Sequence, residues 1–164
     1  MHNIHNIMEI VQLNANAKLS EHFSLGEFTK SGSHPEVYNI PSHEAIANLK
    51  RVCGWLEVLR KRYNEKYGVG EEPVRINSGY RSPQLNRAIH GNAGSNHMTG
   101  CAADIRVSGM EQALRYAVIL MDYADESKQE FDELLIEKNR YGAIWLHFAV
   151  RPANNRRKIL FINA

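Results

Sequence analysis

Length, composition and charge restrict the chain to a few classes of protein. It has 164 residues, of which 43% are hydrophobic and 23% charged, and its net charge is +2. These values are typical of a globular protein with one sizeable core. The charge is too small to indicate a surface for nucleic acid, and no apolar run approaches the roughly 20 residues of a membrane span.

Two features bear on where the chain works. No basic segment followed by an apolar stretch opens the N-terminus, so no secretory signal is visible. The two cysteines, Cys53 and Cys101, are predicted to be unpaired thiols in a reducing compartment. We therefore expect the chain to be cytoplasmic as synthesised, and to be released or virion-associated if a phage encodes it.

The spacing of apolar residues predicts a small α+β domain. Residues 1–18 are expected to form an N-terminal arm, and residues 19–164 a single domain. A long helix is predicted from an N-cap at Ser42 to Gly68, because apolar residues recur between them at helical spacing. Alternation and turn residues then predict a short helix that begins at Pro83, a longer one that begins near residue 109, and strands over 73–78, 102–107, 133–137, 144–150 and 158–162.

Three residues form a candidate metal site: His97, Asp104 and His147. Two imidazoles and one carboxylate are a ligand set that catalytic zinc uses, with the fourth position left for water. In the strand over 144–150, Leu146 and Phe148 lie on an apolar face, and alternation directs His147 to the other face. Asp104 likewise points away from the apolar face of its own strand. Both side chains are therefore expected to face a cleft rather than the core.

Each of the three residues also has a structural interpretation. His97 could be a loop histidine bonded to the backbone, and His147 a semi-buried histidine with its hydrogen bonds satisfied. Asp104 could be a helix cap or the ion-pair partner of Arg106. His90 is the nearest competing ligand, seven residues before His97.

A predicted hairpin offers a general base. If the strands over 133–137 and 144–150 form a hairpin centred near Gly142, Glu137 lies directly across from His147. Opposed residues share a face of the sheet, with Cβ atoms roughly 5 Å apart. Glu137 would then lie beside the metal, although a slip of one residue in the register would turn it away.

Four motifs occur in order along the chain: Ser78-Gly79-Tyr80-Arg81-Ser82, Leu85-Asn86, Ser95-x-His97-x-x-Gly100-x-Ala102-x-Asp104 and Trp145-x-His147. They resemble the zinc D-Ala-D-Ala carboxypeptidase family of metallopeptidases. That family includes cell-wall carboxypeptidases, the D-Ala-D-Ala dipeptidases of vancomycin resistance and phage endolysins. Residues 19–28 resemble the N-terminal part of its small, single-domain branch.

The resemblance implies a central, mainly antiparallel sheet flanked by helices, the fold of the hedgehog/DD-peptidase group. It implies a Zn²⁺ cofactor held by His97, Asp104 and His147, and a peptidoglycan peptide as substrate. Arg81 matches an arginine that binds the substrate near the scissile bond, and we expect Ser95 and Tyr80 to help bind the substrate. We expect the protein to act as a monomer without nucleic acid.

One departure from the family affects the catalytic prediction. Many members carry an acidic residue three positions before the second histidine, where this chain has Ile144. Glu137 is the predicted replacement, with Asp132 and Glu133 in reserve. The alternatives are a non-catalytic, zinc-containing module for cell-wall binding or phage structure, and a structural domain without metal. The choice between carboxypeptidase, dipeptidase and endopeptidase stays open.

Overall fold

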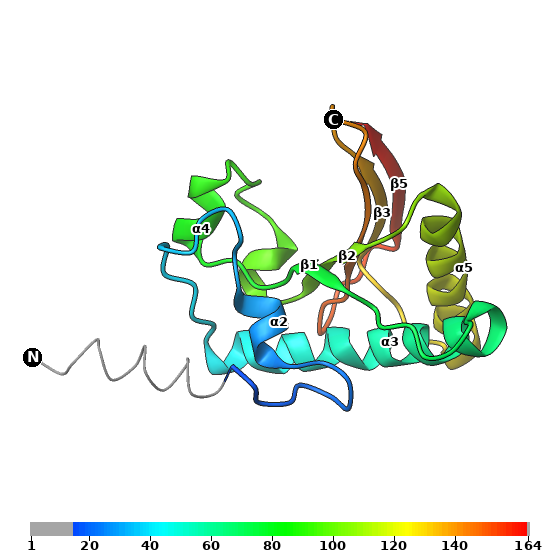
Figure 1. Cartoon of the computed structure of the whole chain (residues 1–164). Helices are drawn as coiled ribbons and strands as arrows, with labels where there is room; N and C mark the ends of the chain where they lie inside the picture. Colours follow the sequence, from blue (N-terminus) through cyan, green and yellow to red (C-terminus); the bar gives the residue numbers. More distant parts are fainter. Residues whose placement is uncertain (1–14, 164) are drawn as a thin grey trace, which may run out of the picture.

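The computed structural model describes residues 15–163 (Figure 1). In chain order the elements are α2 (Leu25–Thr29), α3 (His43–Tyr67), β1 (Ile76–Ser78), α4 (Pro83–Ala88), the 3₁₀ helix η1 (Asn96–Thr99), β2 (Ala102–Arg106), α5 (Met110–Ser127), β3 (Glu133–Lys138), β4 (Ile144–Ala149) and β5 (Lys158–Asn163). The elements predicted from the sequence are all present, although β1 is shorter than the predicted strand. Most of the predicted N-terminal arm lies outside the described residues.

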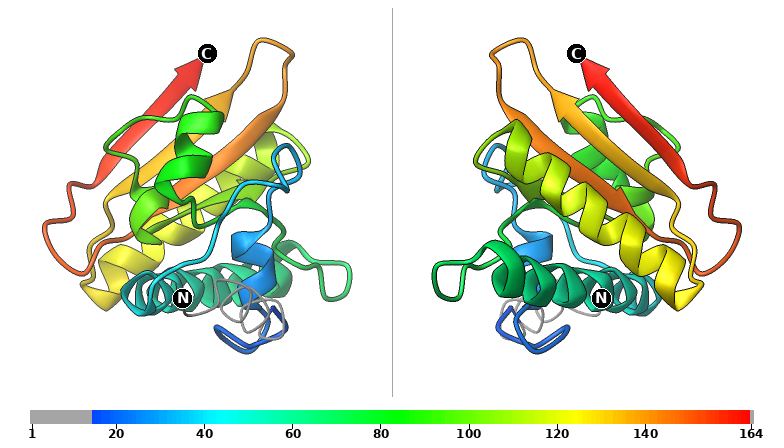
Figure 2. Two further views of the ribbon diagram at one scale, coloured as in Figure 1. Left: turned by 90° about the vertical axis from the view of Figure 1, so that its left-hand side faces the viewer. Right: turned by 90° about the vertical axis from the view of Figure 1, so that its right-hand side faces the viewer.

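The strands form one five-stranded sheet in the order β1-β2-β4-β3-β5. All neighbouring strands are antiparallel except β3 and β5, which are parallel. The two views of Figure 2 show α4 in front of one face of the sheet and α5 in front of the other. The α+β architecture with a mainly antiparallel sheet is therefore confirmed.

The core lies between the long helix α3, α5 and one face of the sheet. The Ser42 hydroxyl caps α3 by accepting a hydrogen bond from the backbone N–H of Ala45 at 3.1 Å. One side of α3 is apolar and packs against inward-facing strand residues. The buried residues of the two layers include Leu49, Val52, Leu56, Leu59, Ala103, Ile105, Leu134, Leu146 and Phe148. The predicted core faces of β2 and β4 are thus confirmed, and the opposite face of the sheet is left for a site.

The register of the β3–β4 hairpin differs from the predicted one by two residues. Leu135 lies opposite His147, and Glu137 lies opposite Trp145. The turn sets this register, because the Asn139 side chain accepts hydrogen bonds from two backbone N–H groups within it, at 3.0 Å each. The predicted direct pairing of Glu137 with His147 is therefore wrong. A shift of two residues keeps the same face, so both side chains still project to the same side.

Gly100 fixes the 3₁₀ helix η1 against α3. It ends η1 in the left-handed conformation, with φ of 76°, and a Cβ atom at this position would overlap the backbone of Ala45 in α3. The Asn48 side chain of α3 also donates a hydrogen bond to the Thr99 carbonyl at 2.9 Å. This close packing holds the segment that carries His97.

The structure also bears on the two cysteines and on the expected lack of a membrane span. Cys53 and Cys101 are both free and buried, and burial raises the pKa of each thiol. Among the helices of residues 15–163, none combines the length and apolar character needed to cross a lipid bilayer.

Two glycine substitutions should have opposite effects on stability. Gly54 is exposed in the middle of α3 with open space around it, so Gly54→Ala should stabilise the protein by about 0.5–1 kcal/mol. Gly100→Ala should destabilise it by about 2 kcal/mol or more, because the new methyl group meets the α3 backbone. Denaturant unfolding measures both. Equal stability of Gly100→Ala and wild type would contradict the packing described above.

Candidate metal centre

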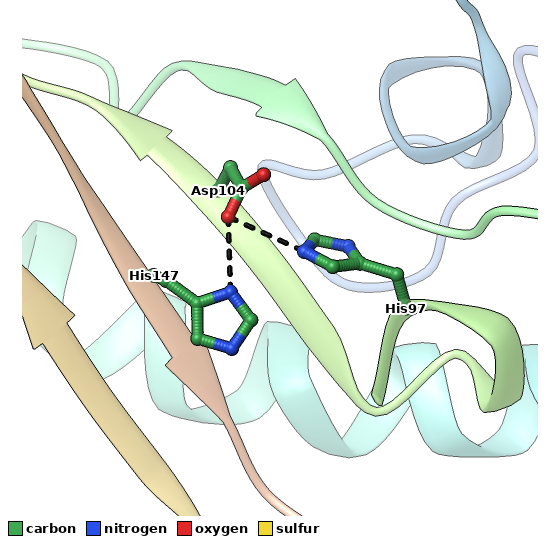
Figure 3. A group of neighbouring side chains, drawn as sticks. All are labelled: His97, Asp104 and His147. Atoms are coloured by element: carbon green, nitrogen blue, oxygen red, sulfur yellow. Dashed lines mark hydrogen bonds and ion pairs between the residues drawn. The ribbon is translucent and has the colours of Figure 1, made fainter. Parts of the chain in front are cut away.

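The three predicted ligands meet on the face of the sheet opposite the core (Figure 3). Asp104 and His147 are directly paired across β2 and β4, so their side chains project from the same face. His97 comes from η1, immediately before β2. All three are buried, with exposed fractions of 2% for His97, 8% for Asp104 and 7% for His147.

The distances between the ligand atoms fit a zinc ion. Asp104 Oδ1 lies 3.3 Å from His97 Nε2 and 3.0 Å from His147 Nδ1. Ligand atoms about 2.0–2.1 Å from a tetrahedral zinc lie roughly 3.3 Å from one another. One oxygen and two imidazole nitrogens also match the donor types that zinc prefers. The residues present therefore fit the ion that the ligand set predicts.

The Asp104 carboxylate carries a negative charge in a buried place. Burial alone would raise the pKa of Asp104, but the two neighbouring imidazoles hold it well below its usual range. Burial alone would lower the pKa of His147, but hydrogen bonds with Asp104 and Glu133 raise it to about 9. The carboxylate thus favours positive charge beside it, which the His147 proton supplies and which a metal ion could supply in its place.

Each histidine is held through the ring nitrogen that faces away from Asp104. His97 Nδ1 lies 2.6 Å from the Gly79 carbonyl oxygen, and His147 Nε2 lies 3.2 Å from Glu133 Oε1. Metal-binding histidines are typically oriented in this way by a carbonyl or a carboxylate. His97 does bond to the backbone, as its structural interpretation requires, but its Nε2 is left facing the site.

Arg81 contacts a proposed ligand directly. Its guanidinium donates hydrogen bonds from Nη2 to Asp104 Oδ2 at 3.0 Å and from Nε to Ser78 Oγ at 3.2 Å. Arg81 therefore orients the carboxylate of the candidate ligand Asp104. It also lines the cavity described below, so substrate binding by Arg81 stays a prediction.

The other two predicted substrate-binding residues lie in different surroundings. The Ser95 hydroxyl caps η1 by accepting a hydrogen bond from the backbone N–H of His97 at 3.2 Å, and Ser95 also lines the cavity. Tyr80 is buried in the core, where its backbone N–H donates to the Phe28 carbonyl at 2.7 Å. The structure does not bring Tyr80 into the cavity.

A cavity of about 350 Å³ opens over the three ligands. Glu137 lines it from β3, on the same face of the sheet as His147. Burial and the nearby Asp104 carboxylate raise the pKa of Glu137. The remaining lining residues come from the turn after β1, the loop after α4, η1, the connection between β4 and β5, and the strands β3 and β5. They include Arg81, Asn92, Gly94, Ser95, Asn96, Glu133, Leu135, Arg156, Lys158 and Ile162.

A polar network beside the cavity was not predicted from the sequence. Asp132, considered there as a reserve base, is fully buried, and its carboxylate accepts hydrogen bonds from Arg156 at 2.8 and 3.0 Å. The Asn96 side chain donates to both Asp132 and Glu133. Arg156 lies 24 residues from Asp132 in the chain, so no local sequence pattern predicts their ion pair.

The fold and the site define a class, a metallopeptidase with a candidate His-Asp-His metal centre. A family model described as Peptidase M15 matches residues 21–131, more than half of the chain. The chain belongs to this family. The match includes Arg81, His97 and Asp104 and ends before the strands that carry Glu137 and His147. A search of curated proteins gives no match.

Removal of any proposed ligand should abolish zinc binding. His97→Ala, Asp104→Ala and His147→Ala each leave two donors, so we expect purified protein to lose its stoichiometric zinc, as measured by elemental mass spectrometry. His90→Asn is the matched control, because His90 is exposed and has a positive φ of 58° that asparagine tolerates. If His90→Asn lost its zinc while the other variants kept theirs, His90 would be a ligand and the proposed site would be wrong.

Asp132 should make the protein sensitive to acid. Burial raises its pKa, but hydrogen bonds from Arg156 and Asn96 outweigh burial and lower the pKa to about 2. Its contribution to stability is therefore complete above its ordinary pKa of 3.8 and is lost as the pH falls toward 2. Between pH 5 and pH 2 the unfolding free energy of the wild type should fall by on the order of 2 kcal/mol more than that of Asp132→Asn, because the variant has no carboxylate to protonate at this position. Denaturant unfolding at a series of pH values tests this, and an unchanged pH profile would contradict it.

Proposed function

We propose that the protein is a zinc-dependent peptidase that hydrolyses amide bonds in the stem peptides of bacterial peptidoglycan. The observation that carries the proposal is the convergence of His97, Asp104 and His147 under a cavity that the Glu137 carboxylate also lines. Membership of the Peptidase M15 family supports a peptide as substrate. The motifs shared with the D-Ala-D-Ala carboxypeptidases support the peptidoglycan peptide in particular.

His97, Asp104 and His147 would hold the ion. When bound, zinc supplies Lewis acidity that polarises a carbonyl group and makes water a stronger nucleophile at neutral pH. The chain's own residues then have two tasks, which are to move a proton and to hold the substrate.

Glu137 is the proposed general base. It lines the cavity on the same face as His147, and its raised pKa makes it a stronger base than a fully exposed glutamate. It would accept the proton of the attacking water and later donate it to the leaving amine. Glu137 would thus take the role of the catalytic acidic residue that many family members carry at the position of Ile144.

Positive charge in the cavity suits a substrate with a free carboxylate. Arg81 and Lys158 both line the cavity, from the turn after β1 and from β5 respectively. Stem peptides end in the carboxylate of a D-amino acid, which a guanidinium can bind through two hydrogen bonds. Ser95 would contact the substrate from the same wall.

A non-catalytic module for wall binding or phage structure is the second candidate. The observation that favours it is Ile144, which stands where many family members have an acidic residue. Such a module would retain zinc and sediment with purified peptidoglycan without releasing any product. Mass spectrometry of defined stem peptides after incubation separates the two functions, and the fragments distinguish carboxypeptidase, dipeptidase and endopeptidase activity.

Glu137→Gln should separate metal binding from catalysis. We expect this variant to retain stoichiometric zinc and to lose hydrolysis of stem peptides by about 10²- to 10⁴-fold, because an amide does not accept the proton. Product release measured by mass spectrometry gives the rate. Glu65→Gln, an exposed change on α3, should keep full activity. Full activity of Glu137→Gln would refute the assignment of the base.

A further inference from the structure

Glu133 lies beside His147 on the side away from Asp104. It is the first residue of β3 and shares a face of the sheet with His147. Its Oε1 lies 3.2 Å from His147 Nε2, while the other ring nitrogen, Nδ1, lies 3.0 Å from Asp104 Oδ1. The imidazole therefore lies between two carboxylates, only one of which belongs to the candidate ligand set.

We propose that Glu133 is a positioning residue for the metal, an inference that rests on the proposed function for the identity of the ion. A carboxylate can only accept a hydrogen bond, so the Glu133 contact would keep the N–H of His147 on Nε2 when an ion is bound. Nδ1, which faces Asp104, would then lose its proton and offer its lone pair to the ion. Glu133 thus fixes the ring orientation of His147 and the nitrogen that it offers.

The two histidines differ in the group that accepts the hydrogen bond from the outer ring nitrogen. The outer nitrogen of His97 is held by a backbone carbonyl, that of Gly79, at 2.6 Å. His147 lies in the middle of β4, between β2 and β3, where the backbone carbonyls are used in the sheet ladder. A side chain from the neighbouring strand must supply the acceptor, and Glu133 is placed to do so.

Glu133 is itself held in place by Asn96. The Asn96 amide donates from Nδ2 to Glu133 Oε1 at 2.5 Å and to Asp132 Oδ2 at 2.8 Å. Its Oδ1 accepts a hydrogen bond from Arg151 Nε at 2.8 Å, which fixes the orientation of the amide. Asn96 directly precedes His97, so one short segment contributes a ligand and supports the residue that orients a second ligand.

Asp132 and two arginines anchor this arrangement. Asp132 is fully buried, accepts two hydrogen bonds from the Arg156 guanidinium, and lies 3.1 Å from Arg151 Nε. Arg156 also lies 3.6 Å from Glu133 Oε2. Two carboxylates and two guanidinium groups balance one another, so Glu133 can stay ionised in a half-buried place.

The contacts of Glu133 favour positioning over service as the general base. Its Oε1 already receives hydrogen bonds from both Asn96 and His147. Glu137 lines the same cavity, and burial and the nearby Asp104 carboxylate raise its pKa, as suits a proton acceptor. A group that orients a ligand and a group that moves a proton are thus separate residues of one strand.

Zinc affinity tests the proposal without reference to activity. Chelator competition with Glu133→Ala should give a zinc dissociation constant raised about 10- to 100-fold. Glu133→Gln keeps the size of the side chain and one acceptor oxygen, so we expect an intermediate loss and a folded protein. Glu130→Gln, an exposed change three residues before Glu133, and Glu137→Gln should both bind zinc as tightly as wild type. Wild-type affinity in both Glu133 variants would overturn the proposal.

Two further measurements separate positioning from catalysis. At saturating zinc, Glu133→Ala should recover most of its kcat, whereas Glu137→Gln should not. Loss of kcat in Glu133→Gln with unchanged zinc affinity would make Glu133 the base and overturn the proposal. Long-range ¹H–¹⁵N spectra of the zinc-loaded wild type should show a protonated Nε2 on His147, and a protonated Nδ1 would also overturn it. If wild type hydrolyses no stem peptide, the proposed function fails while the affinity and spectroscopic results still decide the role of Glu133.

Discussion

A buried carboxylate between two imidazoles and a guanidinium is the interaction on which the rest of the site depends. Moving the Asp104 charge out of water costs free energy that only close, well-directed partners offset. Here His97 and His147 approach one of its oxygens, and Arg81 bonds to the other. These partners come from η1, β4 and the turn after β1, so three separate parts of the fold must meet at one carboxylate.

The division of the sheet into two faces makes this meeting compatible with a stable core. The face toward α3 and α5 is apolar and well packed, while the opposite face carries the acidic residues and both ligands of the β2–β4 pair. Within the polar face, two acidic residues of β3 have different surroundings. Both line the cavity, but Glu133 accepts hydrogen bonds from Asn96 and His147, whereas burial and the Asp104 carboxylate raise the pKa of Glu137.

Periodicity and alternation predict those parts of the structure that depend on local sequence. The α3 helix with its Ser42 cap, the strands, and the outward direction of Asp104 and His147 all follow from such patterns. The hairpin register does not, because hydrogen bonds of the Asn139 side chain within the turn decide it. The bond between Arg81 and Asp104 and the pair of Asp132 with Arg156 join residues 23 and 24 positions apart, and no repeating pattern encodes such contacts.

The placement of two candidate ligands on the central strand pair would link the binding of an ion to the folding of the chain. Asp104 and His147 are 43 residues apart and become neighbours only when β4 pairs with β2. An unfolded chain therefore offers at most the two nearby donors of the η1–β2 segment, and tight binding begins when the middle of the sheet is formed. A bound ion would then slow amide hydrogen exchange most in β2 and β4, because these strands cannot separate while it is held.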